Sequence, residues 1–167
     1  VQGTYPDTSL AQQLKIVARL VAGGLQTKLY LVQIGGFDTH DTQVMAGDNT
    51  KGFHAELLDE LSTGIHSFMQ DCDGLGISDK VMGMTFSEFG RRIISNASNG
   101  TDHGAAAPQF LFGNYVNSTV LGSNPDIPVN AMYDDNLEMQ HDFRQLYSSL
   151  FNQWLCVDNS DTAGIML

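Results

Sequence analysis

The feature that most constrains the fold is the apolar run of residues 29–34, which ends at Gly35 and Gly36 and is followed directly by Asp38 and His40. A short apolar run bounded by glycines is typical of a buried strand. Open α/β sheets place their ligand sites beyond the carboxyl ends of such strands. Carboxylate and imidazole groups are metal ligands, but Asp and Gly also favour ordinary turns. The pattern therefore indicates either a metal-binding loop or a turn.

Helical and strand-like patterns alternate along the chain. Apolar residues at helical spacing predict helices from Ser9, as the capping residue, to Leu25, from Phe53 to Gly74 and from about Asp142 to Leu155. Strands are expected over residues 27–34, 80–86 and 108–112, and the tail after Val157 is expected to fray. The order strand, helix, strand predicts a right-handed crossover between parallel strands. We therefore expect an α/β fold with a mostly parallel sheet flanked by helices, in a single domain over residues 1–167.

Composition excludes several classes of function. Eight basic and nineteen acidic residues give a formal charge of −11, which repels phosphate backbones and argues against nucleic acid as a partner. No run reaches the roughly 18 apolar residues of a membrane helix, so we expect no membrane span. Cys72 and Cys156 are too few to define a disulfide framework. Because the chain opens at Val1 without an initiator Met, we expect a processed product or a fragment.

Two further stretches carry residues that bind metals. Glu88 follows the strand expected over residues 80–86, which would bring it to the same edge of the sheet as Asp38, and a turn-rich loop ends in an adjacent Asp and His. Glu88 is equally well explained by an ion pair with Arg91 or Arg92. The Asp of the second loop is also suited to capping a turn. The candidate ligands are Asp38, His40, Glu88, Asp102 and His103.

Mixed carboxylate and imidazole donors suit Zn²⁺ or Mn²⁺. The alternative is a calcium scaffold, in which Asp38, Asp41 and Asp48 would form an oxygen site with backbone carbonyls. The type of ligand atom separates the two hypotheses, since imidazole nitrogen favours a transition metal and oxygen alone favours calcium.

Several separated motifs together resemble the domain-of-unknown-function 1501 family, which is mostly bacterial, often exported and grouped with the alkaline phosphatase and sulfatase superfamily. The matching stretches are Tyr5-Pro6, Gly35-Gly36-Phe37-Asp38-Thr39-His40, Ser87-Glu88-Phe89-Gly90-Arg91, Gly100-Thr101-Asp102-His103-Gly104 and Asp142-Phe143-Arg144. They span nearly the whole chain and correspond to what would be the carboxyl-terminal part of such a protein. The resemblance implies an alkaline-phosphatase-like fold and an exported, periplasmic or extracellular location.

The resemblance also implies a site. Asp38, His40 and His103 would hold one metal ion, Glu88 would hold a second, and Arg91 or Arg92 would clamp the substrate's oxygens. In a competing placement, residues 102–104 are themselves the second-metal motif. Phe89 stands where the superfamily has a His ligand. The superfamily's nucleophile lies in the amino-terminal half, and we identify none in this chain.

The activity that the resemblance implies is metal-dependent hydrolysis of phosphate or sulfate esters, with a small-molecule or polysaccharide ester as substrate. The alternative is a catalytically degenerate, secreted binding or structural subunit of the same fold. Either protein would have the missing amino-terminal part or other subunits as its partner.

Overall fold

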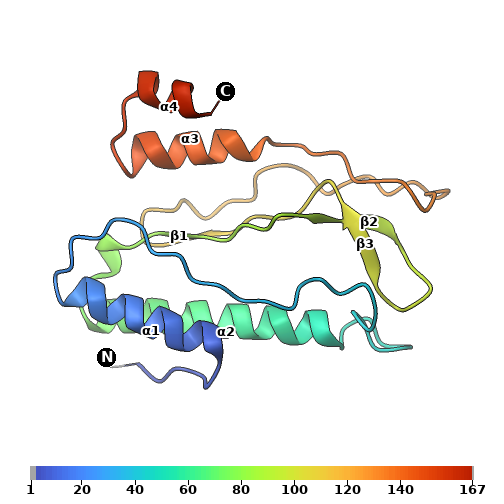
Figure 1. The fold of residues 1–167 in the computed structure, drawn as a ribbon, viewed down its shortest axis with the longest axis horizontal. Helices are drawn as coiled ribbons and strands as arrows, with labels where there is room; N and C mark the ends of the chain where they lie inside the picture. Colours follow the sequence, from blue (N-terminus) through green and yellow to red (C-terminus); the bar gives the residue numbers. More distant parts are fainter. Residues whose placement is uncertain (1–2, 167) are drawn as a thin grey trace.

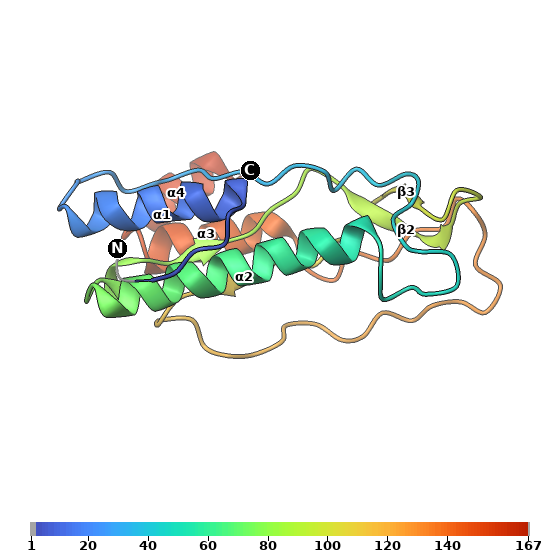
Figure 2. The same cartoon turned by 90° about the horizontal axis from the view of Figure 1, so that it is seen from below.

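The computed structural model describes residues 3–166. Helix α1 (Ser9–Ala22) and helix α2 (Phe53–Gly74) lie side by side on one face of a layer of extended chain. Helix α3 (Phe143–Gln153) and helix α4 (Asn159–Ile165) lie on the other face (Figure 1). The view in Figure 2, turned by 90°, shows that the β2–β3 hairpin stands beyond the amino-terminal end of α2. The hairpin is therefore carried at one end of an elongated molecule.

The helices follow the sequence pattern closely. Thr8, rather than the expected Ser9, caps α1, and its hydroxyl accepts a hydrogen bond from the amide of Ala11 at 3.4 Å. Asp142 caps α3 by accepting from the amide of Arg144 at 2.9 Å. The three predicted helices are confirmed, although α1 and α3 end two to three residues earlier than expected because Gly23 and Trp154 close them.

The core lies between α1, α2 and the extended layer. Leu10 and Leu14 of α1 are 3% and 5% exposed and lie against Gly64 of α2, where the missing side chain lets the two helices approach closely. The other members of the buried cluster are Ala18, Phe68, Cys72, Ile77 and Val81. Val32 and Ile34 from the extended segment pack against it, which fixes that segment on the helices.

The expected parallel, alkaline-phosphatase-like sheet is wrong. Within residues 3–166 the structure contains two separate two-stranded sheets, both antiparallel. One pairs β1 (Gly83–Met84) with β4 (Leu111–Phe112), and the other pairs β2 (Gly90–Ser95) with β3 (Thr101–Gly104). A short 3₁₀ helix, η1 (Ser78–Lys80), precedes β1.

The segment expected to be the first strand is extended but unpaired. No ladder joins residues 27–36 to another strand in the described structure. The side-chain amide of Gln13 in α1 takes the place of a neighbouring strand, donating to the carbonyl of Gln33 at 2.8 Å and accepting from its amide at 3.0 Å. Leu29 and Leu31 are 72% and 79% exposed. The apolar run predicted a strand with both faces buried. In the structure, only one face of this segment packs against the protein.

Two other expectations were wrong for local reasons. The turn-rich loop expected from Ser95 to Gly104 is shorter than predicted, because residues 101–104 form β3, and Asn99 turns the chain before it with a φ of 56°. The tail after Val157 forms α4 instead of fraying, because the side-chain amide of Asn152 donates to the carbonyl of Val157 and to the hydroxyl of the buried Thr162. Within the described residues, no helix is long and apolar enough to cross a membrane.

Candidate metal centre

The loop after the extended segment brings Asp38 and His40 to the same side. Two close backbone hydrogen bonds tighten it, from Thr39 to the carbonyl of Phe37 at 2.9 Å and from His40 to the carbonyl of Asp38 at 3.2 Å. Thr39 is buried at 6% exposure, while its neighbours Asp38 and His40 are exposed. The Asp-x-His spacing therefore presents a carboxylate and an imidazole together.

The β2–β3 hairpin delivers the second pair of side chains. Asn96 holds its tip, accepting from the amides of Ser98 and Gly100 at 2.9 and 3.1 Å and donating to the carbonyl of His40 at 2.6 Å. At Gly100 a Cβ atom would lie only 2.2 Å from that same carbonyl oxygen, so any side chain would push the loop away. The hairpin and the loop of residues 37–40 therefore meet through a glycine and one amide side chain.

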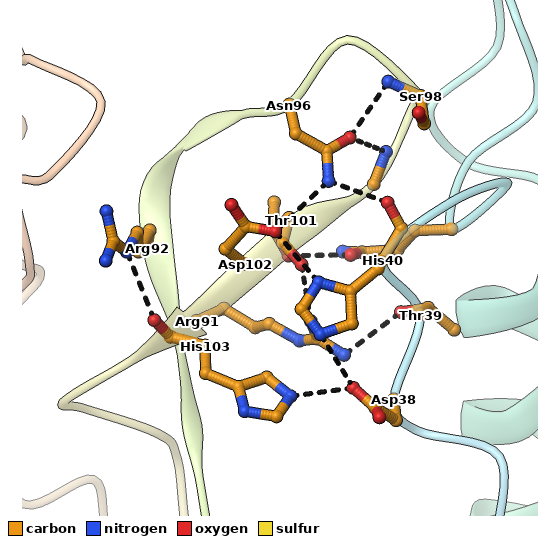
Figure 3. Close-up of polar contacts among 12 residues, drawn as sticks. Asp38, Thr39, His40, Arg91, Arg92, Asn96, Ser98, Thr101, Asp102 and His103 are labelled. Carbon is orange, nitrogen blue, oxygen red and sulfur yellow. Dashed lines mark hydrogen bonds and ion pairs between the residues drawn. The ribbon is translucent and has the colours of Figure 1, made fainter.

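Asp38, His40 and His103 form a compact cluster of metal-ligand atoms (Figure 3). The Oδ1 atom of Asp38 lies 2.6 Å from Nε2 of His103 and 3.1 Å from Nε2 of His40. One donor atom from each residue lies within 4.8 Å of the others. Tetrahedral ligands about 2.1 Å from an ion lie roughly 3.4 Å apart, so small side-chain shifts would fit these donors around Zn²⁺ or a similar ion.

Asp102 supports His40 from behind. Its Oδ1 atom lies 2.8 Å from Nδ1 of His40, while Nε2 of the same ring faces Asp38. The hydroxyl of Tyr133 donates to the other carboxylate oxygen, and Asn96 donates to Oδ1 at 3.4 Å. A carboxylate on one imidazole nitrogen fixes the tautomer that leaves the other nitrogen free to bind a metal, and it raises the basicity of that nitrogen. Asp102 thus occupies the position from which a carboxylate orients a His that can bind a metal.

Both carboxylates are held in their ionised forms. A hydrogen bond from His103 lowers the pKa of Asp38, and the nearby His40 adds to the effect. Hydrogen bonds from Tyr133 and His40 lower the pKa of Asp102 to about 2. At neutral pH the cluster therefore carries the charged oxygens that a divalent cation requires.

Arg91 is engaged with the protein backbone. Its Nη1 and Nη2 atoms donate to the carbonyls of Thr101 and Phe37, and Nη2 lies 3.4 Å from the hydroxyl of Thr39. The guanidinium lies over the ring of Phe89, which stacks on His103 at a centroid distance of 3.9 Å. Arg92, the other clamp candidate, donates to the carbonyl of His103 and pairs with Asp134.

The structure therefore brings together four of the five predicted ligands, three as one donor cluster and Asp102 in contact with His40. Glu88 is exposed and belongs to no potential metal-binding group among the described residues. Sequence reasoning missed Tyr133 and Asn96. Asn96 had a signal, since an Asn before a turn commonly caps it, whereas Tyr133 lies in the long connection before α3 and had none.

A hollow of about 340 Å³ opens beside the cluster. Phe53 and Leu57 of α2 form an apolar part of its wall. The acidic residues that line it are Asp38, Asp41, Glu56 and Glu60. It gives Asp38 an approach from solvent on the side of α2.

The chain folds as a small α and β protein with an exposed group of aspartate and histidine side chains whose donor atoms could hold a metal ion. The model of the DUF1501 family, described as a protein of unknown function, matches residues 3–159. The chain belongs to that family. Comparisons with curated proteins and with solved structures find no match.

Proposed function

We propose that the protein is a metal-dependent hydrolase of phosphate or sulfate esters and that this chain carries part of its metal site. The observation that carries the proposal is the convergence of Asp38, His40 and His103 from two separate segments, with Asp102 behind His40. A metal-ligating His almost always donates its second ring N–H to a carboxylate, a carbonyl or water, and His40 has Asp102 in that position.

The residues divide the work between them. Asp38, His40 and His103 hold the ion, and Asp102 keeps Nε2 of His40 available to it. A divalent ion in this position would polarise an ester oxygen and stabilise the charge that develops on the leaving group. The resemblance of the Gly35 to His40 stretch to metal loops of the alkaline phosphatase and sulfatase superfamily supports this chemistry. The resemblance also supports an exported, periplasmic or extracellular location.

The donor types favour Zn²⁺ or Mn²⁺ over calcium. Two of the three donors are imidazole nitrogens, which calcium seldom takes. Asp48, a member of the alternative oxygen site, accepts instead from the hydroxyl and amide of Thr50 at 2.6 and 3.0 Å and pairs with Lys51. That carboxylate is occupied in its own turn.

A second candidate is a degenerate, secreted binding or structural subunit of the same family. Phe89 favours it, because its ring stacks face to face on the imidazole of His103, with 6° between the ring planes, and brings no donor to the site. Such a subunit would bind the ion without cleaving esters. The amino-terminal part of the protein or another subunit would supply whatever chemistry the assembly performs.

The test measures metal content and hydrolysis in the same preparations. We expect one Zn²⁺ or Mn²⁺ per chain by elemental analysis, and loss of that ion in the variants His40→Ala and His103→Ala. His66→Ala is the matched control, because His66 is an exposed histidine on α2. Hydrolysis of p-nitrophenyl phosphate and p-nitrophenyl sulfate should require the bound ion. Wild-type protein without stoichiometric metal, or variants with unchanged hydrolysis, would refute the proposal, and metal without hydrolysis would favour the subunit.

A further inference from the structure

Arg91 joins the two segments that carry the metal donors. One end of its guanidinium donates to the carbonyl of Phe37, the residue directly before Asp38. The other end donates to the carbonyl of Thr101, the residue directly before Asp102. These carbonyls lie 64 positions apart in the sequence, and a single planar side chain donates to both of them.

The position of Arg91 in the hairpin strengthens this link. Arg91 lies opposite His103 in the register between β2 and β3, so its backbone is placed by the strand that carries the third donor. The ring of Phe89 contacts both groups, since the guanidinium lies over it at 5.0 Å and the imidazole of His103 is stacked on it. All three donors of the cluster are thus located relative to one guanidinium group.

The geometry of a guanidinium suits this task. Its donors are fixed in a plane and point in different directions, whereas a lysine ammonium is a point charge on a flexible stem. The contacts with Phe37, Thr101 and Thr39 engage both terminal nitrogens in bonds to the protein. A group committed in this way is placed to position the loops rather than to clamp a substrate.

We propose that Arg91 is a positioning residue that sets the spacing between Asp38 and His103 by tying the carbonyls of Phe37 and Thr101 together. The inference rests on the proposed metal site for its functional consequence, but the tie itself is independent of any ion. Supporting groups around a metal typically change its affinity by about 10- to 100-fold, and we expect Arg91 to act in that range.

The experiment compares Arg91→Lys and Arg91→Ala with the control Arg19→Lys, which changes an arginine of α1. Zn²⁺ affinity is measured by calorimetry, and coordination is followed by the visible absorption of bound Co²⁺. We expect both Arg91 variants to lose about 10- to 100-fold in affinity and to alter the Co²⁺ spectrum, while the control matches wild type. Ethylguanidinium added to Arg91→Ala should restore the spectrum, which a general loss of folding would not allow.

A metal-free measurement separates this inference from the proposed function. The rings of His40 and His103 have centroids 4.8 Å apart, so their protons should show a nuclear Overhauser effect in wild-type protein and lose it in Arg91→Lys. Loss of that effect in a protein that binds no metal would uphold the tie and overturn the metal site. An unchanged effect with unchanged Zn²⁺ affinity would overturn the tie. Unchanged affinity with a raised KM for an ester would instead assign Arg91 to the substrate.

Discussion

Replacing Asp102 by alanine tests whether His40 is prepared for a metal ion. Asp102 accepts from Nδ1 of His40 at 2.8 Å and is itself held by Tyr133 and Asn96. The substitution removes the only side chain that contacts the Nδ1 side of the ring among the described hydrogen bonds and ion pairs. His40 can then adopt either tautomer and turn away from Asp38.

The expected loss of Zn²⁺ affinity in Asp102→Ala follows from how many metal donors the substitution disturbs. One of three donors loses its orienting carboxylate while the other two stay in place, so we expect Zn²⁺ affinity to fall by about 10- to 100-fold rather than vanish. Tyr133→Phe removes one of the hydrogen bonds that hold Asp102 and should give a smaller decrease. The ranking wild type, Tyr133→Phe, Asp102→Ala is therefore part of the prediction.

Competition with a chelator of known affinity measures this ranking. The control is Asp134→Ala, which removes the same charge from a neighbouring residue whose side chain is 85% exposed and pairs with Arg92. It should bind Zn²⁺ like wild type. Equal losses in Asp102→Ala and Asp134→Ala would show that net charge alone sets the affinity, and no loss in Asp102→Ala would refute the orienting role.

The remaining predictions concern acid stability, the core, the cysteines and the exposed apolar surface. The pKa of Asp102 is lowered from 3.8 to about 2, so its stabilising contribution is complete above about pH 4 and is lost as the pH falls through 2. The free energy of unfolding of Asp102→Asn, measured with urea, should therefore change less between pH 4 and pH 2 than that of wild type. The same pH dependence in both proteins would contradict this. Leu14→Ala, at 5% exposure, should lower the free energy of unfolding by about 2–5 kcal/mol, whereas Leu121→Ala, at 73% exposure, should change it by less than about 0.5 kcal/mol. Burial raises the pKa of the Cys72 thiol to about 12, so iodoacetamide at pH 8 should label the exposed Cys156 first, and faster labelling of Cys72 would show that its site opens. Dye binding to exposed apolar surface should fall when Leu31 is changed to Ser, because this side chain is 79% exposed.

The grouping of Asp38, His40 and His103 could be predicted from sequence in part, because two of these residues are close in the chain. Asp38 and His40 are two residues apart in one short loop, so their proximity does not depend on which strand lies beside them. His103 was identified by residue type and by its turn-rich setting. Tyr133 could not be found in this way, since its contact with Asp102 depends on how the long connection after β4 folds back over the hairpin.

The sheet could not be predicted from the same information. The periodicity of apolar residues indicates which side chains are buried. Hydrogen bonds between strands depend instead on neighbouring strands that are distant in sequence. Residues 27–34 show the difference: Val32 and Ile34 pack on the core as the pattern requires, yet Gln13 rather than a strand contacts the backbone of Gln33.

The solvent-accessible area shows how far the observed burial falls short of the burial that the sequence pattern predicts. The chain exposes 11,339 Å², whereas a compact folded monomer of 18.2 kDa exposes about 8,100 Å². Leu29 and Leu31 contribute to this excess of exposed area. Their apolar side chains are the reason that the segment was predicted to be a strand buried on both faces. The error in the expected fold therefore has the same origin as the exposed apolar surface: the sequence encodes more burial than residues 3–166 achieve by themselves. The group of Asp38, His40 and His103 is unaffected by this error, because a local hairpin and one loop bring these side chains together and no parallel sheet is needed.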